Sequence, residues 1–139
     1  MDNELSWRER RREASVAQAA ALAHRKANET AQARALLTAF IEELKARGVE
    51  PQPLRAPVVG SGASYRTGIV GWYLKRNHSL GADPDGNFYI LGTAASLKAR
   101  LFGVRPVPSD PPLTVGLGAR DGESLPLEQL LRNRLEETG

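Results

Sequence analysis

A stretch without glycine or proline, from Trp7 to Arg47, constrains this chain more than any other feature. Ala, Leu, Glu, Arg and Gln dominate it, and their high helix propensities predict a long helix. Unbroken, that helix would be about 60 Å long, more than a domain of 139 residues can cover by itself. Asn28 in "HRKANET" is the one good position for a break, because asparagine can cap a second helix. The sequence therefore predicts a long N-terminal helix, either continuous or broken near Asn28.

Both ends of this helix carry capping signals. "SWRE" has the pattern of a capping box, in which the Ser6 and Glu9 side chains each accept a hydrogen bond from the other residue's backbone N–H. At the other end, Gly48 suits the left-handed position of a Schellman motif, and Pro51 prevents the helix from continuing. The helix is therefore expected to begin near Ser6 and to end just before Gly48.

The two halves of the helix differ in their apolar residues. The C-terminal half carries a core-facing stripe at helical spacing, made of Ala33, Leu37, Phe40, Ile41 and Leu44. The first half carries mainly alanines, which bury little area. We therefore expect the first half to project from the domain, to dock loosely, or to pair with a helix of another protein or of a second copy. The candidate residues for that pairing are Trp7, Val16, Ala19, Ala20, Leu22, Ala23 and Ala27.

The middle of the chain predicts a three-stranded antiparallel meander. Its strands are expected in "IVGWYLK", "SLGA" and "NFYIL", with turns at "RNH" and "PDG". Gly86 supplies the left-handed residue of the second turn. Alternation places Val70, Trp72, Leu74, Phe88 and Ile90 toward the helices, and Tyr73, Lys75, Tyr89 and Leu91 on the opposite face.

The remaining segments complete an α+β fold. "EPQPLRAP" is interpreted as an extended linker, and "LTVGLG" predicts another strand. Residues 94–104 fit a strand or a helix, and a short helix between Thr93 and Gly103 is favoured. A last helix is expected to start at Ser124 or Pro126, with a buried stripe of Leu127, Leu130, Leu131 and Leu135. The predicted fold is a long N-terminal helix, an antiparallel sheet of about four strands and a C-terminal helix. It divides into a helical segment, residues 1–50, and a small α+β domain, residues 51–139, which is expected to form one folding unit with the C-terminal half of the helix.

Composition excludes several classes of protein. The chain has no cysteine, which excludes disulfides, zinc–thiolate sites, iron–sulfur clusters and thiol nucleophiles. No apolar run approaches the roughly 20 residues that span a bilayer, and "WRERRRE" near the start is unlike a secretory signal. A cytoplasmic location is therefore expected. The prevalence of Ala, Arg, Leu and Gly is typical of a GC-rich bacterial genome.

Candidates for catalysis or metal binding are few. The two histidines, His24 and His78, lie far apart in the sequence and neither has metal-ligand spacing around it. Asp83 and Asp85 flank Pro84, where aspartate is ordinary turn chemistry. We therefore expect no catalytic residue, no metal site and no cofactor, and an enzyme is the least favoured class.

A basic middle next to an acidic end suggests an anionic partner. Residues 55–105 carry seven Lys/Arg and two Asp, whereas residues 106–139 carry three Arg and six Asp/Glu. Aromatic and basic side chains on the outer face of the meander suit single-stranded nucleic acid. The candidate residues are Arg66, Tyr73, Lys75, Arg76, His78 and Tyr89. Two alternatives stay open: the acidic end folds over the basic middle, or the tyrosine rings simply cover the sheet.

These observations favour a small cytoplasmic protein without enzymatic activity that binds other proteins. Its expected partner is another protein or a second copy, bound through the alanine-rich first half of the helix. The alternative is RNA or single-stranded DNA bound on the sheet. No motif is specific enough to indicate a family.

Overall fold

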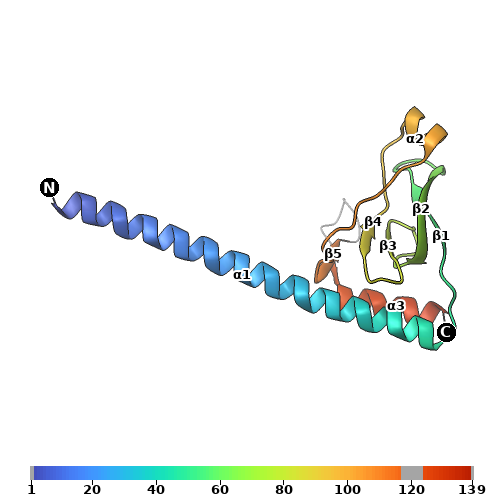
Figure 1. Ribbon diagram of the computed structural model, residues 1–139, viewed down its shortest axis with the longest axis horizontal. Coiled ribbons are helices and arrows are strands. Elements are labelled where there is room, and N and C mark those ends of the chain that lie inside the picture. The colour runs from blue at the N-terminus through green and yellow to red at the C-terminus, as the bar shows by residue number, and fades with distance from the viewer. Residues whose placement is uncertain (1, 117–123, 139) are drawn as a thin grey trace.

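The computed structural model describes residues 2–116 and 124–138 (Figure 1). A single helix, α1 (Asp2–Ala46), runs into a compact domain that contains all the other elements. The main sheet contains β1 (Gln52–Pro57), β2 (Ser64–Tyr73), β3 (Leu80–Ala82) and β4 (Phe88–Ile90). They are followed by α2 (Leu97–Phe102), the pair β5 (Thr114–Gly116) and β6 (Ser124–Pro126), and α3 (Leu127–Thr138). The α+β fold expected from the sequence is confirmed.

Helix α1 is continuous, which is one of the two forms expected from the sequence, but the prediction of where it begins is wrong. It passes through Asn28 without a break, because the helix propensity of asparagine is only about 0.7 kcal/mol below that of alanine and strong helix formers lie on both sides. It also begins at Asp2, so Ser6 is an interior residue and not a cap. The carbonyl of Ser6 accepts a hydrogen bond from Arg10 Nε at 3.3 Å. Glu4 and Leu5 are good helix formers, which lets the helix begin one turn earlier than the capping signal.

The C-terminal end of α1 is the predicted Schellman motif. Gly48 has a φ of 74°, in the left-handed region that glycine adopts without strain. The Val49 N–H donates to the Leu44 carbonyl and the Gly48 N–H donates to the Lys45 carbonyl, both at 3.0 Å. The chain therefore turns sharply out of α1 and enters β1.

The segment interpreted as a linker forms β1, so that prediction is wrong. β1 pairs antiparallel with β2, with Arg55 opposite Arg66 and Ala56 opposite Tyr65. Because β1 is at the edge of the sheet, its two prolines need not donate to a further strand. Proline content alone is therefore compatible with an edge strand.

The meander of β2, β3 and β4 is confirmed. β2 and β3 pair with Trp72 opposite Ala82, and β3 and β4 pair with Leu80 opposite Ile90. Gly86 has a φ of 90°, as the second turn requires. The Gly86 N–H donates to the Asp83 carbonyl at 3.1 Å and closes that turn.

The last third of the chain follows the prediction in part. Residues 94–104 contain the short helix α2, which begins later than expected, with Ser96 as its cap. β5 covers part of "LTVGLG", and Leu117 and Gly118 lie outside the described residues. Ser124 and Pro126 belong to β6, which pairs with β5, and α3 starts at Leu127. The hydrogen bonds between β5 and β6 explain why the helix starts later than its sequence signal.

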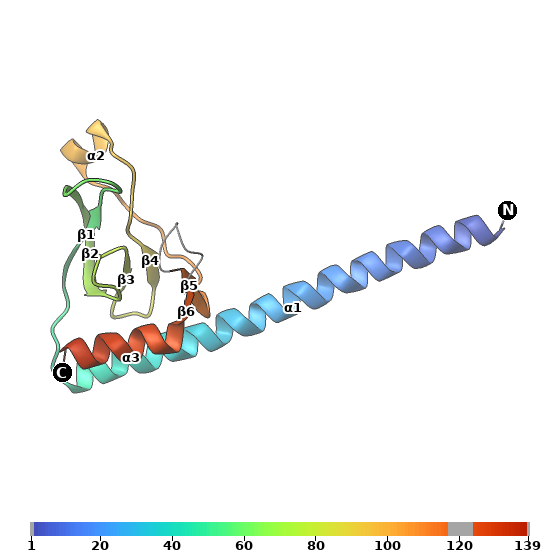
Figure 2. The same ribbon diagram turned by 180° about the vertical axis from the view of Figure 1, so that it is seen from behind.

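The main core lies between one face of the sheet and the two long helices. The predicted stripes of α1 and α3 pack there against Trp72, Leu74 and Phe88, and only Leu135 of those stripes is less than fully buried. Figures 1 and 2 show α3 lying along the C-terminal part of α1 below the sheet. Val70 and Ile90 were expected in this core but are exposed by 49% and 59%. Val70 lines an open cleft together with Phe102 of α2, away from α1 and α3. Ile90 lies on the edge strand β4 and lines a different open cleft.

Replacement of Gly86 tests the register of the meander. Gly86→Val forces a β-branched residue into the left-handed region and should cost on the order of 1–2 kcal/mol of unfolding free energy. No atom lies within 4 Å of a Cβ placed there, so the cost comes from backbone strain and not from a clash. Gly86→Asn is the matched control and should cost less, because asparagine tolerates this region. Equal melting temperatures for the two variants would show that the turn is different.

Candidate functional site

The first part of α1 is a helix that the domain does not cover. Every residue from 3 to 29, here called the projecting segment, is exposed. Large apolar side chains are among them, with Val16 exposed by 65% and Leu22 by 56%. Figures 1 and 2 show this segment extending away from the domain in both views. Of the outcomes expected from the sequence, projection from the domain is the one observed within the chain.

The projecting segment has charged ends and a neutral centre. It carries six Lys/Arg and four Glu, and none of these lies between residues 14 and 23. Arg8 pairs with Glu4 at 4.0 Å, and the Arg11 guanidinium lies 4.6 Å from the centre of the Trp7 ring. Exposed contacts of this kind are weak. They leave the centre of the segment, which is mostly alanine, accessible to another molecule.

The helix places most of the predicted pairing residues on one side. At about 3.6 residues per turn, Val16, Ala19 and Ala23 continue the face that carries the core stripe of α1. Leu22 lies at one edge of this face, and Ala20 and Ala27 lie at the other edge. Trp7 lies on the opposite side, so the structure does not bring it together with the others.

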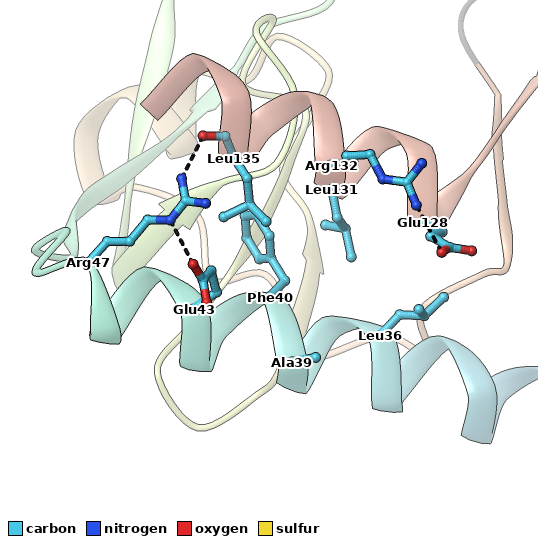
Figure 3. Close-up of a pocket in the computed structure, with 9 residues that line it drawn as sticks. All are labelled: Leu36, Ala39, Phe40, Glu43, Arg47, Glu128, Leu131, Arg132 and Leu135. Carbon is cyan, nitrogen blue, oxygen red and sulfur yellow. Dashed lines mark hydrogen bonds and ion pairs between the residues drawn. The ribbon is translucent and has the colours of Figure 1, made fainter. Parts of the chain in front are cut away.

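A shallow groove lies between α1 and α3 and was not anticipated from the sequence. Its volume is about 330 Å³, and its apolar lining includes Leu36, Phe40 and Leu131. Figure 3 shows two charged pairs at its rim, one on each helix. Arg47 Nε lies 2.8 Å from Glu43, and Arg132 lies 3.1 Å from Glu128. Because each carboxylate has a guanidinium partner, the rim is close to neutral.

Tyr73 and Tyr89 do not lie on an open sheet face, so that prediction is wrong. Tyr73 is 5% exposed and Tyr89 is 7% exposed, and both pack with Leu54 and Leu91 in a second apolar cluster. The Tyr73 hydroxyl accepts a hydrogen bond from the Arg55 N–H at 2.8 Å. Strand β1, which was taken for a linker, supplies Leu54 and this N–H. The rings therefore have no free face on which a nucleic-acid base could stack.

The Tyr89 hydroxyl belongs to a polar network around Asp83. It donates a hydrogen bond to an Asp83 carboxylate oxygen at 2.8 Å, and the Asn87 side chain donates to the same oxygen at 2.9 Å. Partial burial alone would raise the pKa of Asp83, but the hydrogen bonds from Asn87 and Tyr89 outweigh it and hold the pKa below its usual value. Burial, together with the bond to Asp83, raises the pKa of Tyr89 to about 12. This network fastens the second turn of the meander to the strand that follows it.

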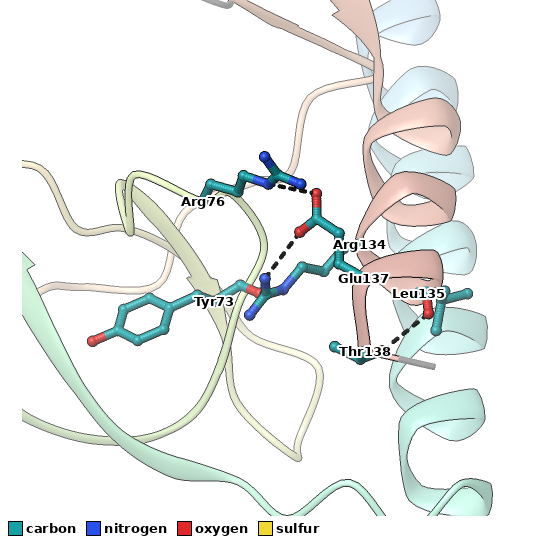
Figure 4. Close-up of polar contacts among 6 residues, drawn as sticks. All are labelled: Tyr73, Arg76, Arg134, Leu135, Glu137 and Thr138. Carbon is teal, nitrogen blue, oxygen red and sulfur yellow. Dashed lines mark hydrogen bonds and ion pairs between the residues drawn. The ribbon is translucent and has the colours of Figure 1, made fainter.

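The basic residues near the first turn of the meander have partners within the chain. Arg76 pairs with Glu137 of α3 at 2.9 Å, and Lys75 donates to the Gly116 carbonyl at 3.4 Å. The His78 ring stacks on Tyr73 with centroids 3.7 Å apart. Figure 4 shows Glu137 between Arg76 and Arg134. The acidic end of the chain therefore does fold over part of the basic middle.

Glu137 is the centre of that contact. Its carboxylate also accepts from Arg134 at 3.1 Å, and Arg134 in turn donates to the Tyr73 carbonyl at 3.0 Å. Desolvation alone would raise the pKa of Glu137, but Arg134 and Arg76 hold it below its usual value. A network of two arginines and one glutamate thus connects the end of α3 to the sheet.

Arg66, the last predicted nucleic-acid residue, lies in a different place. It lines a cleft of about 750 Å³ together with Arg55 and Arg105. Phe102 and Val70 form part of the apolar lining. The grouping of these arginines was missed because they come from three segments. The sequence does indicate an excess of positive charge in this region, because residues 51–82 and 93–109 contain no aspartate or glutamate.

The described residues contain no cluster of metal ligands. Across residues 2–116 and 124–138, no three His, Cys, Asp or Glu side chains gather as metal ligands would. In the same ranges, no helix is both long and apolar enough to cross a bilayer. Comparison with protein-family models, with curated proteins and with solved structures finds no match. We therefore infer the function from the exposed surfaces of the chain.

The Asp83–Tyr89 network predicts how stability depends on pH. The pKa of Tyr89 is raised in the folded state. The protonated Tyr89 hydroxyl therefore contributes its full stabilisation of the fold below about pH 10, and this contribution is lost as the pH rises toward 12. The pKa of Asp83 is lowered in the folded state. The ionised Asp83 carboxylate therefore stabilises the fold above about pH 4, and this contribution is lost as the pH falls. Tyr89→Phe should cost about 1.5–3 kcal/mol near neutral pH, the usual range for a hydrogen bond to a charged group.

Urea unfolding of the wild type and of Tyr89→Phe across a pH series measures both effects. The variant should lose less stability than the wild type between pH 10 and 12, because its residue 89 does not titrate. Parallel curves for the two proteins in that range would contradict the assigned hydrogen bond.

Proposed function

We propose that this chain is a small non-enzymatic protein-interaction module and that the projecting segment of α1 is its docking element. The observation that carries the proposal is a run of helix, residues 3–29, in which every residue is exposed. Helical order there leaves Val16 and Leu22 in water, although burying such side chains contributes about 1.5–3 kcal/mol each. A partner that covers this face would gain that energy. A cytoplasmic location remains a prediction.

Small residues define how a partner would approach. Val16, Ala19 and Ala23 lie on one side of the helix, and short side chains let a second helix come close. This side is continuous with the stripe by which α1 packs in its own domain. A partner helix would therefore extend the packing of the domain core outward along α1.

Charge favours a different protein over a parallel pair of copies. The projecting segment has a net charge of +2, with Arg8, Arg10, Arg11 and Arg12 concentrated near its start. A parallel pair of copies would place these arginine runs against each other, which is unfavourable. A partner with acidic residues flanking an apolar stripe would complement both the centre and the ends. We therefore assign the docking element to a protein with an acidic, helix-binding surface.

Site-specific crosslinking in the full chain tests this proposal. A photoreactive residue at position 16 or 23 should yield a defined protein adduct in cells, whereas the same residue at position 17 or 21, on the opposite side of the helix, should not. Mass spectrometry of the adduct identifies the partner. An adduct with the chain itself would show a second copy instead. Absence of adducts, or equal yields at all four positions, would contradict a docking face.

Affinity for the partner so identified gives a second measure. Val16→Glu with Leu22→Glu places two charges on the docking face and should weaken binding at least tenfold. Ala17→Glu with Ala21→Glu adds the same charge on the other side and is the matched control. Both variants should keep the melting temperature of the domain, because all four residues are exposed.

A further inference from the structure

The end of the domain farthest from α1 and α3 combines positive charge with exposed apolar side chains. Figures 1 and 2 show α2 at this end, beside the turn between β1 and β2. Here it is called the basic tip, and its cations are Arg55, Arg66, Lys98, Arg100 and Arg105. Three of these arginines line the cleft that separates β1 and β2 from the chain after α2.

The positive charge of the basic tip is not balanced locally. The segments that build it, residues 51–82 and 93–109, contain no aspartate or glutamate. Arg55 donates to the Ser64 hydroxyl at 2.8 Å, and Arg66 donates to the Leu101 carbonyl at 3.3 Å. Both acceptors are neutral. Within the described ranges of the chain, none of the five cations lies in an ion pair.

The apolar part of the basic tip is unusually exposed. Helix α2 has six residues, of which only Ala99 is buried. Leu97, Leu101 and Phe102 are exposed by 72%, 62% and 76%. Val59 and Val107 are also exposed in the neighbouring loops. Single exposed apolar residues are common, whereas several on one short helix are typical of an interaction surface.

We propose that the basic tip binds the surface of an anionic phospholipid bilayer. Its arginines and lysine would face the phosphate groups, and the apolar side chains of α2 would enter the boundary between headgroups and acyl chains. The apolar residues are mainly aliphatic, which suits acyl chains. Single-stranded nucleic acid would instead favour aromatic side chains for stacking, and Phe102 is the one large aromatic side chain exposed on α2. This site is separate from the docking element on α1.

Vesicle co-sedimentation of the full chain tests the lipid contact. The chain should bind phosphatidylcholine vesicles that contain phosphatidylserine, should not bind phosphatidylcholine alone, and should dissociate as salt rises. Leu101→Ser with Phe102→Ser should lower the affinity about tenfold, because the inserted apolar area is lost. Val16→Ser with Leu22→Ser, which are also exposed apolar residues but lie on α1, is the matched control and should bind like the wild type.

A second pair of variants separates the basic tip from the arginine run of α1. Arg100→Gln with Arg105→Gln should weaken binding and flatten its salt dependence, whereas Arg10→Gln with Arg12→Gln, the same change in charge, should not. Circular dichroism melting shows whether each variant is folded. No vesicle binding by the wild type, or loss of binding in the α1 variant but not in the tip variant, would overturn the proposal. So would tip-dependent binding of a single-stranded oligonucleotide without binding to vesicles.

Discussion

The apolar stripe of α1 between Ala33 and Leu44 is the contact on which the rest of the molecule depends. These side chains pack in one cluster with residues of the sheet and of α3, so they hold the helix and complete the core. They also fix one end of a helix of 45 residues. Helix nucleation is the unfavourable step in helix formation, and it has already occurred where the stripe is packed. The projecting segment therefore needs only to propagate, which its alanines and arginines favour.

This arrangement separates two surfaces of different character. Residues 3–29 form a helix that is anchored at one end and exposed along its length. The basic tip lies at the end of the domain farthest from α3. The network of Arg76, Arg134 and Glu137 neutralises part of the basic middle at the helical end only. The positive charge near α2 has no such partner among the described residues, so the charge asymmetry of the sequence is concentrated at one end of the domain.

Features set by local chemistry could be predicted from the sequence. Gly48 and Gly86 occupy left-handed positions because glycine, which has no Cβ, adopts them most readily, and the leucine stripe of α3 follows from its spacing. Of the two forms left open for α1, the continuous helix is the one observed, because one weak helix former at Asn28 cannot outweigh strong helix formers on both sides. The predicted start at Ser6 was wrong because a capping residue does not keep the good helix formers before it out of the helix.

Features set by distant parts of the chain could not be predicted in this way. The burial of Tyr73 and Tyr89 depends on Leu54, which comes from a segment whose prolines concealed an edge strand. The cleft of Arg55, Arg66 and Arg105 requires three segments to converge, and no spacing in the sequence encodes that. The pairing face of α1 was identified from its alanines, but Trp7 was assigned to it without reference to the helix geometry that places it on the other side.

Residue-resolved hydrogen exchange on the dilute full chain tests the central claim most directly, namely that one packed stripe supports a helix whose first part is uncovered. Amides between residues 33 and 46 should exchange only when the whole domain unfolds. Amides between residues 8 and 29 should exchange orders of magnitude faster, with protection that declines toward the start of α1. Equal protection of the two parts in the dilute chain would contradict the account, because the projecting segment would then have to be packed against something within the chain itself.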